Sequence, residues 1–186
     1  MLEEKHVVSL VLEGNQAAFK SLVKQYERMV FYIVYKLTDN PDIAKDIAQE
    51  VFIKVYRNIS KFKFESKLST WIGKITYSET VNYLKKENRY TTADRLDEIH
   101  ATTLKSDDNP FDNTHKNDIS FHLKNAIARL PEHYRRVLVL YHLDEFDYKE
   151  IGDICQMPEG TVKNYIFRAR KLLKEDLELN FKEEWV

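Results

Sequence analysis

The most regular feature of the chain is the recurrence of apolar residues at the spacing that places them on one side of an α-helix. Residues 16–37 carry the clearest stripe, formed by Phe19, Leu22, Val23, Tyr26, Met29, Val30, Ile33, Val34 and Leu37. Asn40 and Pro41 then suit the N-cap and first turn of a second helix, whose apolar positions run to Val55. The spacing returns from about Thr70 to Asn88. We therefore expect an N-terminal bundle of helices.

The helical pattern stops at residue 90 and resumes at residue 119. Between these positions Asp and Glu outnumber Lys and Arg, and residues 106–110 have the composition of a turn. From Ile119 a helix is expected to Leu130, and Pro131 should end it and open another that runs to about His142. The pattern predicts an all-α protein of two small helical domains, 1–89 and 119–186, joined by a flexible acidic linker, 90–118.

The composition of the chain excludes several classes of protein function. The chain has 29 Lys and Arg against 30 Asp and Glu, a net charge of −1, so DNA binding would need a local basic face or a protein partner. Its single cysteine excludes an internal disulfide, and its six histidines show no metal-ligand spacing. There is no glycine-rich phosphate loop. We expect no cofactor, metal, catalytic activity or small-molecule substrate. The absence of a signal segment and of a membrane-length apolar run predicts a cytoplasmic protein.

Residues 148–174 predict a short helix, a tight turn and a second, basic helix. Asp147 and Glu150 have the spacing of a capping box before the short helix, and Met157–Gly160 form the turn. The second helix has an apolar stripe at Val162, Ile166, Ala169 and Leu173. This arrangement is typical of a helix-turn-helix that reads the DNA major groove. The competing interpretation is an amphipathic helix whose basic face is merely solvated.

Four segments of this half resemble region 4 of bacterial sigma factors, the domain that binds the promoter −35 element. They are Leu130-Pro131-Glu132, Tyr148 to Ile151, Gly160-Thr161-Val162-Lys163 and Arg168-Ala169-Arg170. The likeness is greatest to the extracytoplasmic-function (ECF, group IV) type. A Gly-Thr-Val-Lys segment also occurs in other helix-turn-helix regulators, so this half alone leaves the family open. The resemblance implies −35 contacts by Tyr148, Thr161, Lys163, Asn164, Phe167, Arg168, Arg170 and Lys171.

Asp46 to Tyr56 resembles the region 2 helix with which sigma factors dock on a coiled coil of the largest RNA polymerase subunit. The resemblance implies polymerase contacts by Asp46, Gln49, Glu50 and Lys54. An exposed acidic and amide face suits a partner helix that carries arginines. Considered by itself, the same pattern also fits an amphipathic helix with a solvated outer face.

The loop from Phe62 to Trp71 and the helix after it resemble the element of region 2 that melts and holds −10 DNA. Aromatic faces can receive unstacked bases, and lysines can follow the phosphates of a single strand. The implied −10 residues are Phe62, Lys63, Phe64, Ser66, Lys67, Trp71, Lys74, Ser78, Lys85, Lys86 and Arg89. The chain departs from the family at Ser78, where Asn is frequent, and at residues 65–67. The competing interpretation places Phe62, Phe64 and Trp71 in the core.

Together these segments predict a sigma factor that binds core RNA polymerase and promoter DNA and directs initiation. The resemblance also implies an anti-sigma factor as partner, which would hold the chain at the membrane when it is membrane-bound. One alternative is a conventional helix-turn-helix regulator that binds its operator without polymerase. Another is a helical protein that titrates a partner and never touches DNA.

Overall fold

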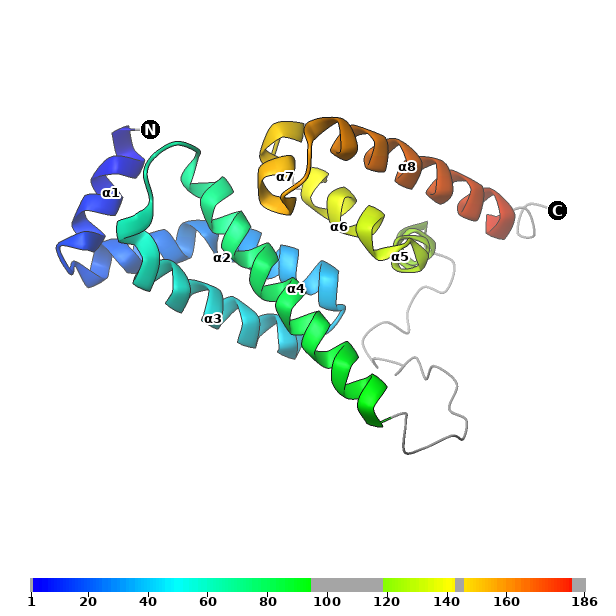
Figure 1. Ribbon diagram of the computed structural model, residues 1–186, viewed down its shortest axis with the longest axis horizontal. Coiled ribbons are helices and arrows are strands. Elements are labelled where there is room, and N and C mark those ends of the chain that lie inside the picture. Colours follow the sequence, from blue (N-terminus) through cyan, green and yellow to red (C-terminus); the bar gives the residue numbers. More distant parts are fainter. Residues whose placement is uncertain (1, 95–118, 143–145, 182–186) are drawn as a thin grey trace.

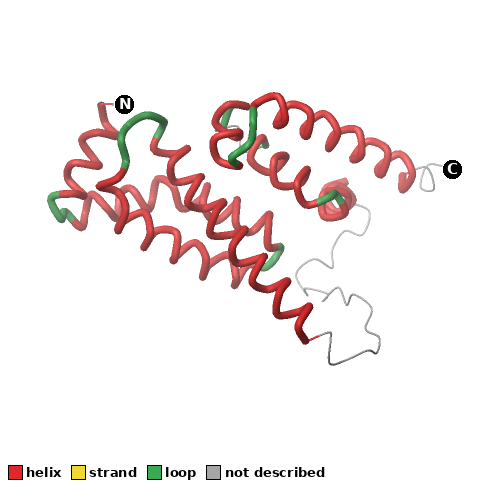
Figure 2. The backbone as a smooth tube through the Cα atoms, viewed as in Figure 1, coloured by secondary structure: helices red, strands yellow, loops and turns green. Residues whose placement is uncertain are grey.

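The computed structural model describes residues 2–94, 119–142 and 146–181, and the regular structure in these ranges is helical throughout. The described chain holds eight α-helices and one short 3-10 helix, and no strand (Figures 1 and 2). The all-α prediction is thus confirmed for these ranges. Most of the predicted linker, residues 95–118, lies outside them.

The N-terminal half is a bundle whose helices turn their apolar stripes toward one another. Its elements are α1 Leu2–Leu12, α2 Gln16–Thr38, α3 Pro41–Asn58, the 3-10 helix η1 Ile59–Lys61, and α4 Leu68–Asp94. Helix α2 packs against both α3 and α4 and buries Leu22, Val30 and Ile33 completely. Each such side chain contributes about 1.5–3 kcal/mol when fully buried. The predicted stripe of residues 16–37 is therefore the centre of the bundle.

Local capping explains where α2 ends and α3 begins. Asp39 closes α2 in the left-handed conformation, with φ of 51°, and its N–H donates to the carbonyl of Tyr35. The side chain of Asn40 then accepts hydrogen bonds from the N–H groups of Asp42 and Ile43, and Pro41 occupies the first turn. The predicted N-cap and first-turn proline are confirmed.

Two N-terminal elements differ from the prediction. Helix α1 was not expected, and its Glu4 carboxylate accepts a hydrogen bond from the N–H of Leu68, at 3.3 Å. This side chain caps α4 from outside, so α4 begins two residues before the predicted Thr70. At its other end α4 continues to Asp94, into the predicted linker, because no glycine or proline interrupts it.

The C-terminal half contains α5 Ile119–Arg129, α6 Glu132–Tyr141, α7 Tyr148–Cys155 and α8 Glu159–Phe181. The break at Pro131 is confirmed. The capping box is also confirmed: Asp147 accepts from the N–H of Glu150, and Glu150 accepts from the N–H of Asp147. A small core of Ala126, Leu130, Leu138, Ala169 and Leu173 joins α5, α6 and α8.

The two halves pack against each other along α4. Figure 1 shows α7 and α6 beside the N-terminal bundle, and the contacts run from α4 to α7 and from α2 to α6. Gly73 of α4 permits this approach, because a Cβ there would lie 3.0 Å from Ile154 and 3.1 Å from Phe146. One hydrophobic cluster consequently extends through both halves.

Candidate nucleic-acid and polymerase interfaces

Helix α8 separates an apolar side from a basic side, as its sequence predicts. Val162, Ile166, Ala169 and Leu173 are buried. The outer side exposes the residues predicted to read DNA, namely Lys163, Asn164, Phe167, Arg168, Arg170 and Lys171. Thr161 and Tyr148 are half-buried beside them. An exposed row of amide and cationic side chains can bond both base edges and phosphates.

The turn between α7 and α8 depends on a close backbone approach at Gly152. A Cβ there would lie 2.7 Å from the carbonyl oxygen of Met157, whose N–H donates to the carbonyl of Gly152 at 2.9 Å. Gln156 ends α7 in the left-handed conformation, with φ of 57°. These contacts fix the angle at which α8 leaves the turn. The sequence reasoning did not single out Gly152.

A stacked pair of tyrosines supports the start and middle of the basic side of α8. The rings of Tyr141 and Tyr148 are parallel within 7° with centroids 5.6 Å apart. Arg170 lies 4.9 Å from the Tyr141 ring, and Lys163 lies 5.5 Å from the Tyr148 ring. Cations over aromatic faces are attracted by the ring quadrupole. Tyr141 is therefore a positioning residue that the sequence pattern did not reveal.

The residues of the predicted polymerase surface lie on α3. Asp46, Gln49 and Glu50 are exposed and stand at helical spacing on one side. Ile53, 41% exposed, continues that side one turn later and had not been predicted. Lys54 behaves differently, because it forms an ion pair with Glu79 of α4 and is only half exposed. Lys54 thus joins α3 to α4 in this structure, instead of standing free for a partner.

The loop between η1 and α4 holds its aromatic residues in different environments. Phe62 is only 6% exposed and packs against Phe64 and Trp71, with ring centroids 4.7 and 5.5 Å away. Phe62 thus lies in the core, as the competing interpretation placed it, and its predicted contact with a base stays a prediction. Trp71 is half-buried, whereas Lys63, Ser66 and Lys67 are exposed.

Phe64 is the unusual residue of this loop. It adopts a φ of 60°, a conformation that is strained for a bulky side chain, at a cost on the order of 1–3 kcal/mol. Its ring is half-buried and has Lys5 of α1 at 5.7 Å from its centroid. Such strain persists only where the surroundings determine it, so α1 and Phe62 together hold the loop in shape.

Helix α4 carries the remaining predicted −10 residues on its outer side. Lys74, Ser78, Lys85 and Lys86 are exposed, and the side chain of Arg89 lies outside the described residues. Two hollows flank this row. A hollow of about 320 Å³ is lined by Lys54, Asn58, Lys61, Trp71, Lys74, Ile75, Ser78 and Glu79. A hollow of about 290 Å³ is lined by Lys74, Tyr77, Ser78, Val81, Asn82, Lys85, Arg136, Ile154, Cys155 and Gln156.

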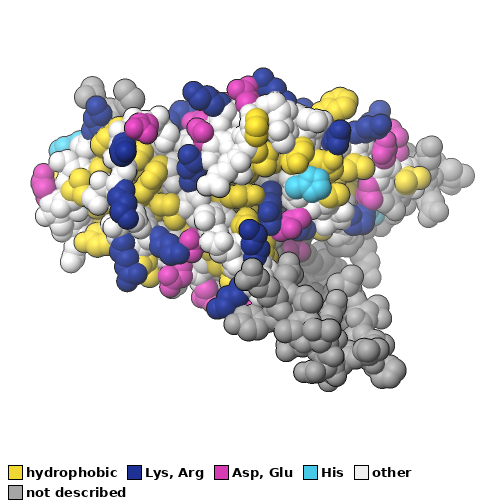
Figure 3. All heavy atoms as spheres, viewed as in Figure 1, with side chains coloured by type: hydrophobic (Ala, Val, Ile, Leu, Met, Phe, Trp, Pro, Cys, Tyr) yellow, Lys and Arg dark blue, Asp and Glu magenta, His cyan; other side chains and the backbone are white. Residues whose placement is uncertain are grey.

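Figure 3 shows Lys and Arg side chains spread over both halves of one face of the molecule, with acidic side chains among them. Within the described residues, no group of His, Cys, Asp and Glu side chains is arranged to hold a metal ion. None of the helices in the described ranges combines the length and apolarity needed to cross a membrane.

Comparison with known proteins identifies the family of the chain. Residues 22–90 match the family described as Sigma-70 region 2, and residues 121–173 match Sigma-70, region 4. The ECF RNA polymerase sigma factor SigW of Bacillus subtilis is 33% identical over 179 residues, which cover 93% of this chain and 96% of that protein. The ECF RNA polymerase sigma-E factor of Escherichia coli K12 is 33% identical over 178 residues, covering 92% and 93%.

Solved structures show the same fold. The sigma factor RpoE of Bartonella quintana, in complex with the anti-sigma factor NepR, aligns with a TM-score of 0.69 and 22% identity over 86% of this chain and 96% of that chain. CnrH, in complex with the cytosolic domain of CnrY, aligns with a TM-score of 0.67 and 18% identity over 93% and 96%. With both regions matched and relatives one-third identical along almost the whole length, the chain belongs to the ECF sigma factors of the sigma-70 family.

Proposed function

We propose that this chain binds core RNA polymerase and directs it to promoters through three separate surfaces. The observation that supports the proposal most strongly is that one chain contains both a region 2 and a region 4. A conventional regulator has no need of a polymerase-docking helix beside its DNA reader, so the comparisons do not favour that alternative. Bond formation would belong to the polymerase, and we expect no catalytic step by the chain itself.

The outer side of α3 is the proposed polymerase surface. Asp46, Gln49 and Glu50 would accept hydrogen bonds from cationic side chains of a partner helix, and Ile53 would bury its exposed apolar surface beside them. Lys54 would contribute indirectly, because its ion pair with Glu79 aligns α3 with α4.

The loop and outer side of α4 form the proposed −10 surface. Phe64 and Trp71 offer half-buried rings to unstacked bases, while Lys67, Lys74 and Lys85 follow the phosphates. The hollow of about 320 Å³ beside Trp71 has room for a base that has left the duplex. In this scheme Phe62 supports the rings without meeting DNA itself.

The basic side of α8 is the proposed −35 reader. Asn164 and Arg168 have side chains that can bond two atoms of one base edge, and Lys163 and Lys171 can neutralise phosphates. The family also suggests an anti-sigma partner, since both structural neighbours were solved as complexes, one with a protein named as an anti-sigma factor. We place the activity in the cytoplasm, where polymerase and chromosome meet.

Transcription by purified core polymerase tests the proposal. Core enzyme alone, or core with this chain, would be supplied with a library of random promoter templates, and transcript starts would be sequenced. We expect starts that share two upstream motifs only when the chain is present. A chain that modulates starts already made by another sigma factor, or makes none, contradicts the proposal.

A further inference from the structure

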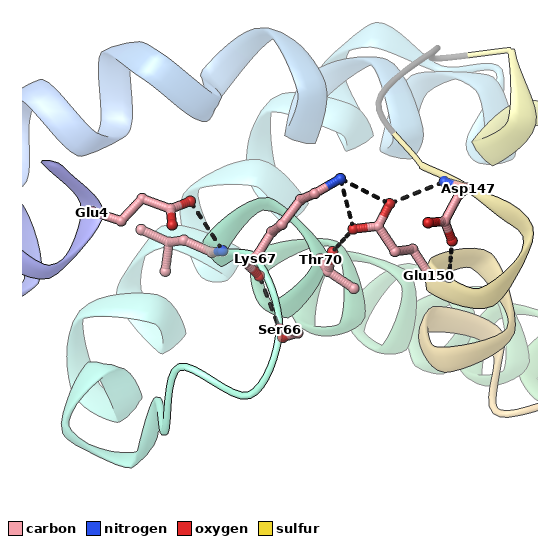
Figure 4. Close-up of polar contacts among 7 residues, drawn as sticks. Glu4, Ser66, Lys67, Thr70, Asp147 and Glu150 are labelled. Atoms are coloured by element: carbon pink, nitrogen blue, oxygen red, sulfur yellow. Dashed lines mark hydrogen bonds and ion pairs between the residues drawn. The ribbon is translucent and has the colours of Figure 1, made fainter. Parts of the chain in front are cut away.

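The start of α4 is capped by a residue that lies far from it in the sequence. The carbonyl of Lys67 accepts the N–H of Trp71 at 3.1 Å, so Lys67 is the N-cap residue, and its ammonium group cannot accept a hydrogen bond. Glu4 of α1 supplies the missing acceptor, because its carboxylate accepts the N–H of Leu68 at 3.3 Å (Figure 4). A negative charge is favourable at this end of a helix, where the first N–H groups have no partner within the helix.

The next residue of α1 contacts the same segment at its aromatic side chain. Residues 62–67, which lie between η1 and α4, are called the −10 loop below. Lys5 Nζ lies 5.7 Å from the centroid of the Phe64 ring, at the residue whose φ is 60°. A cation over an aromatic face is attracted by the ring quadrupole, and a strained backbone persists only where its surroundings determine it. Two consecutive residues of α1 therefore hold the −10 loop at its middle and at its end.

Helix α1 can hold the loop because it is itself fixed on the bundle. Val8 and Val11 are only 1% and 3% exposed and belong to the main hydrophobic cluster. The helix packs against α2 and η1 (Figure 1). Val8 lies one turn after Glu4 and so on the same side of the helix, which directs the Glu4 side chain toward the bundle.

The C-terminal half also contacts the start of α4, but it belongs to a different part of the chain. Lys67 Nζ is 3.1 Å from a carboxylate oxygen of Glu150, and the hydroxyl of Thr70 donates to the same carboxylate at 2.9 Å (Figure 4). Helix α1, in contrast, packs in the same bundle as the −10 loop. The contacts of Glu4 and Lys5 consequently hold the loop without help from the C-terminal half.

The shape of this loop matters for the choice of bases. In the proposed function Phe64 and Trp71 receive unstacked bases, and specificity is the difference in affinity between the correct and the wrong base. A loop that is ordered before binding loses less entropy on binding and presents one arrangement of rings, whereas a mobile loop can adapt to several bases. Helix α1 ends before residue 22, where the match to region 2 begins.

We infer that α1 is part of the −10 reader, with Glu4 and Lys5 as positioning residues that set its base preference through the −10 loop. The inference rests on the proposed function. Glu4 acts on the backbone at the entry to α4, and Lys5 acts on the Phe64 ring. Loss of either contact frees the loop, so the chain still captures −10 DNA but distinguishes its bases less well.

Four substitutions separate these contacts from general effects of α1. Glu4→Ala removes the acceptor, whereas Glu4→Gln keeps an amide oxygen that can accept the N–H of Leu68. Lys5→Met removes the cation but keeps a long side chain, whereas Lys5→Arg keeps the cation for the Phe64 ring. The matched controls are Glu27→Ala and Lys24→Met, which make the same charge changes at exposed positions of α2.

The first measurement is amide hydrogen exchange of the Leu68 N–H, followed by NMR on each full-length variant without polymerase or DNA. We expect Glu4→Ala to speed this exchange at least about tenfold, because the N–H loses its acceptor, and Glu4→Gln to restore most of the protection. Both controls should exchange like the parent. Equal exchange in Glu4→Ala and in the parent overturns the inference.

The second measurement is base preference in transcription by core polymerase with each full-length variant. The templates form two libraries, one with a randomised −10 motif and one with a randomised −35 motif of a promoter that the parent chain uses. We expect Glu4→Ala and Lys5→Met to lower the preference for the best −10 bases about three- to fivefold and to leave the −35 preference unchanged. Glu4→Gln and Lys5→Arg should restore it.

Two results in transcription overturn the inference. One is an unchanged −10 preference in both Glu4→Ala and Lys5→Met. The other is an equal loss of preference at −10 and −35, which would mean that α1 only stabilises the fold. Failure of the proposed function would appear differently, because the parent chain itself would then produce no starts with shared motifs.

Discussion

At the scale of single residues, the tightest steric constraint in the helix-turn-helix lies at Gly152. We expect Gly152→Ala to lower the free energy of unfolding by about 1–3 kcal/mol, because the new Cβ would press on the carbonyl oxygen of Met157. Gly160→Ala should raise stability by up to about 1 kcal/mol, since a Cβ there meets nothing within 4 Å and alanine favours the helix. Urea unfolding of both variants measures the difference, and shifts of the same sign would contradict it.

The reactivity of the Cys155 thiol should report its burial. Burial raises the pKa of Cys155 to about 12, against a smaller opposing effect of the Tyr77 hydrogen bond and the Arg136 charge. Since the thiolate is the reactive form, alkylation of the folded chain at pH 8 should be on the order of a thousandfold slower than that of the chain in urea. Thiolate absorbance near pH 9 in the folded chain would contradict this expectation.

The same pKa shift makes stability depend on alkaline pH. Burial raises the pKa of Tyr77 to about 12 as well, so the folded chain holds the protons of Cys155 and Tyr77 more tightly than the unfolded chain does. Their contribution is fully present below the ordinary values of 9.0 and 10.0 and is lost as the pH rises toward 12. Urea midpoints at successive pH values from 8 to 11 should fall less steeply for Tyr77→Phe than for the parent.

At the scale of elements, helices with a strong local signal could be predicted from sequence. The stripe of α2, the Asn40 cap and the Asp147 capping box each depend on neighbouring residues, and each is confirmed. Helix α1 has no such signal, and the hydrogen bond by which its Glu4 caps α4 joins residues that are distant in the sequence. The contact at Gly73 and the burial of Phe62 also follow from tertiary packing, which periodicity does not encode.

The outer side of α3 gives a prediction for polymerase binding. Glu50→Lys and Ile53→Asp should each weaken binding to core polymerase at least about tenfold, or about 1.4 kcal/mol, because one reverses a charge and the other adds charge to an apolar contact. Glu27→Lys, at an exposed position of α2, serves as the charge-matched control. Fluorescence titration of labelled chain with core enzyme measures these affinities. Equal losses of affinity in all three variants would mean that the net charge of the chain, and not this surface of α3, determines polymerase binding.

At the scale of the whole molecule, the positive charge that reads DNA is local, on a chain whose net charge is −1. If Lys163, Arg170 and Lys171 each neutralise one phosphate, duplex affinity of the free chain should fall on the order of twentyfold between about 50 and 150 mM salt. These cations already have partners in the fold: Lys163 pairs with Glu159, Lys171 pairs with Glu175, and Arg170 lies over the Tyr141 ring. The free chain should therefore bind the −35 duplex weakly, and the polymerase must supply the remaining affinity.

The salt dependence of DNA binding distinguishes a chain that needs polymerase for promoter affinity from one that binds promoter DNA tightly by itself. Lys171→Ala should reduce the slope of log affinity against log salt by about one for the free chain. In the polymerase complex the same substitution should cost a smaller fraction of promoter binding, because the α3 and −10 surfaces then share the attachment. Filter binding of both forms to one promoter fragment at four salt concentrations checks this. An equal fractional loss in both forms would mean that α8 carries the affinity alone and that the two halves act independently.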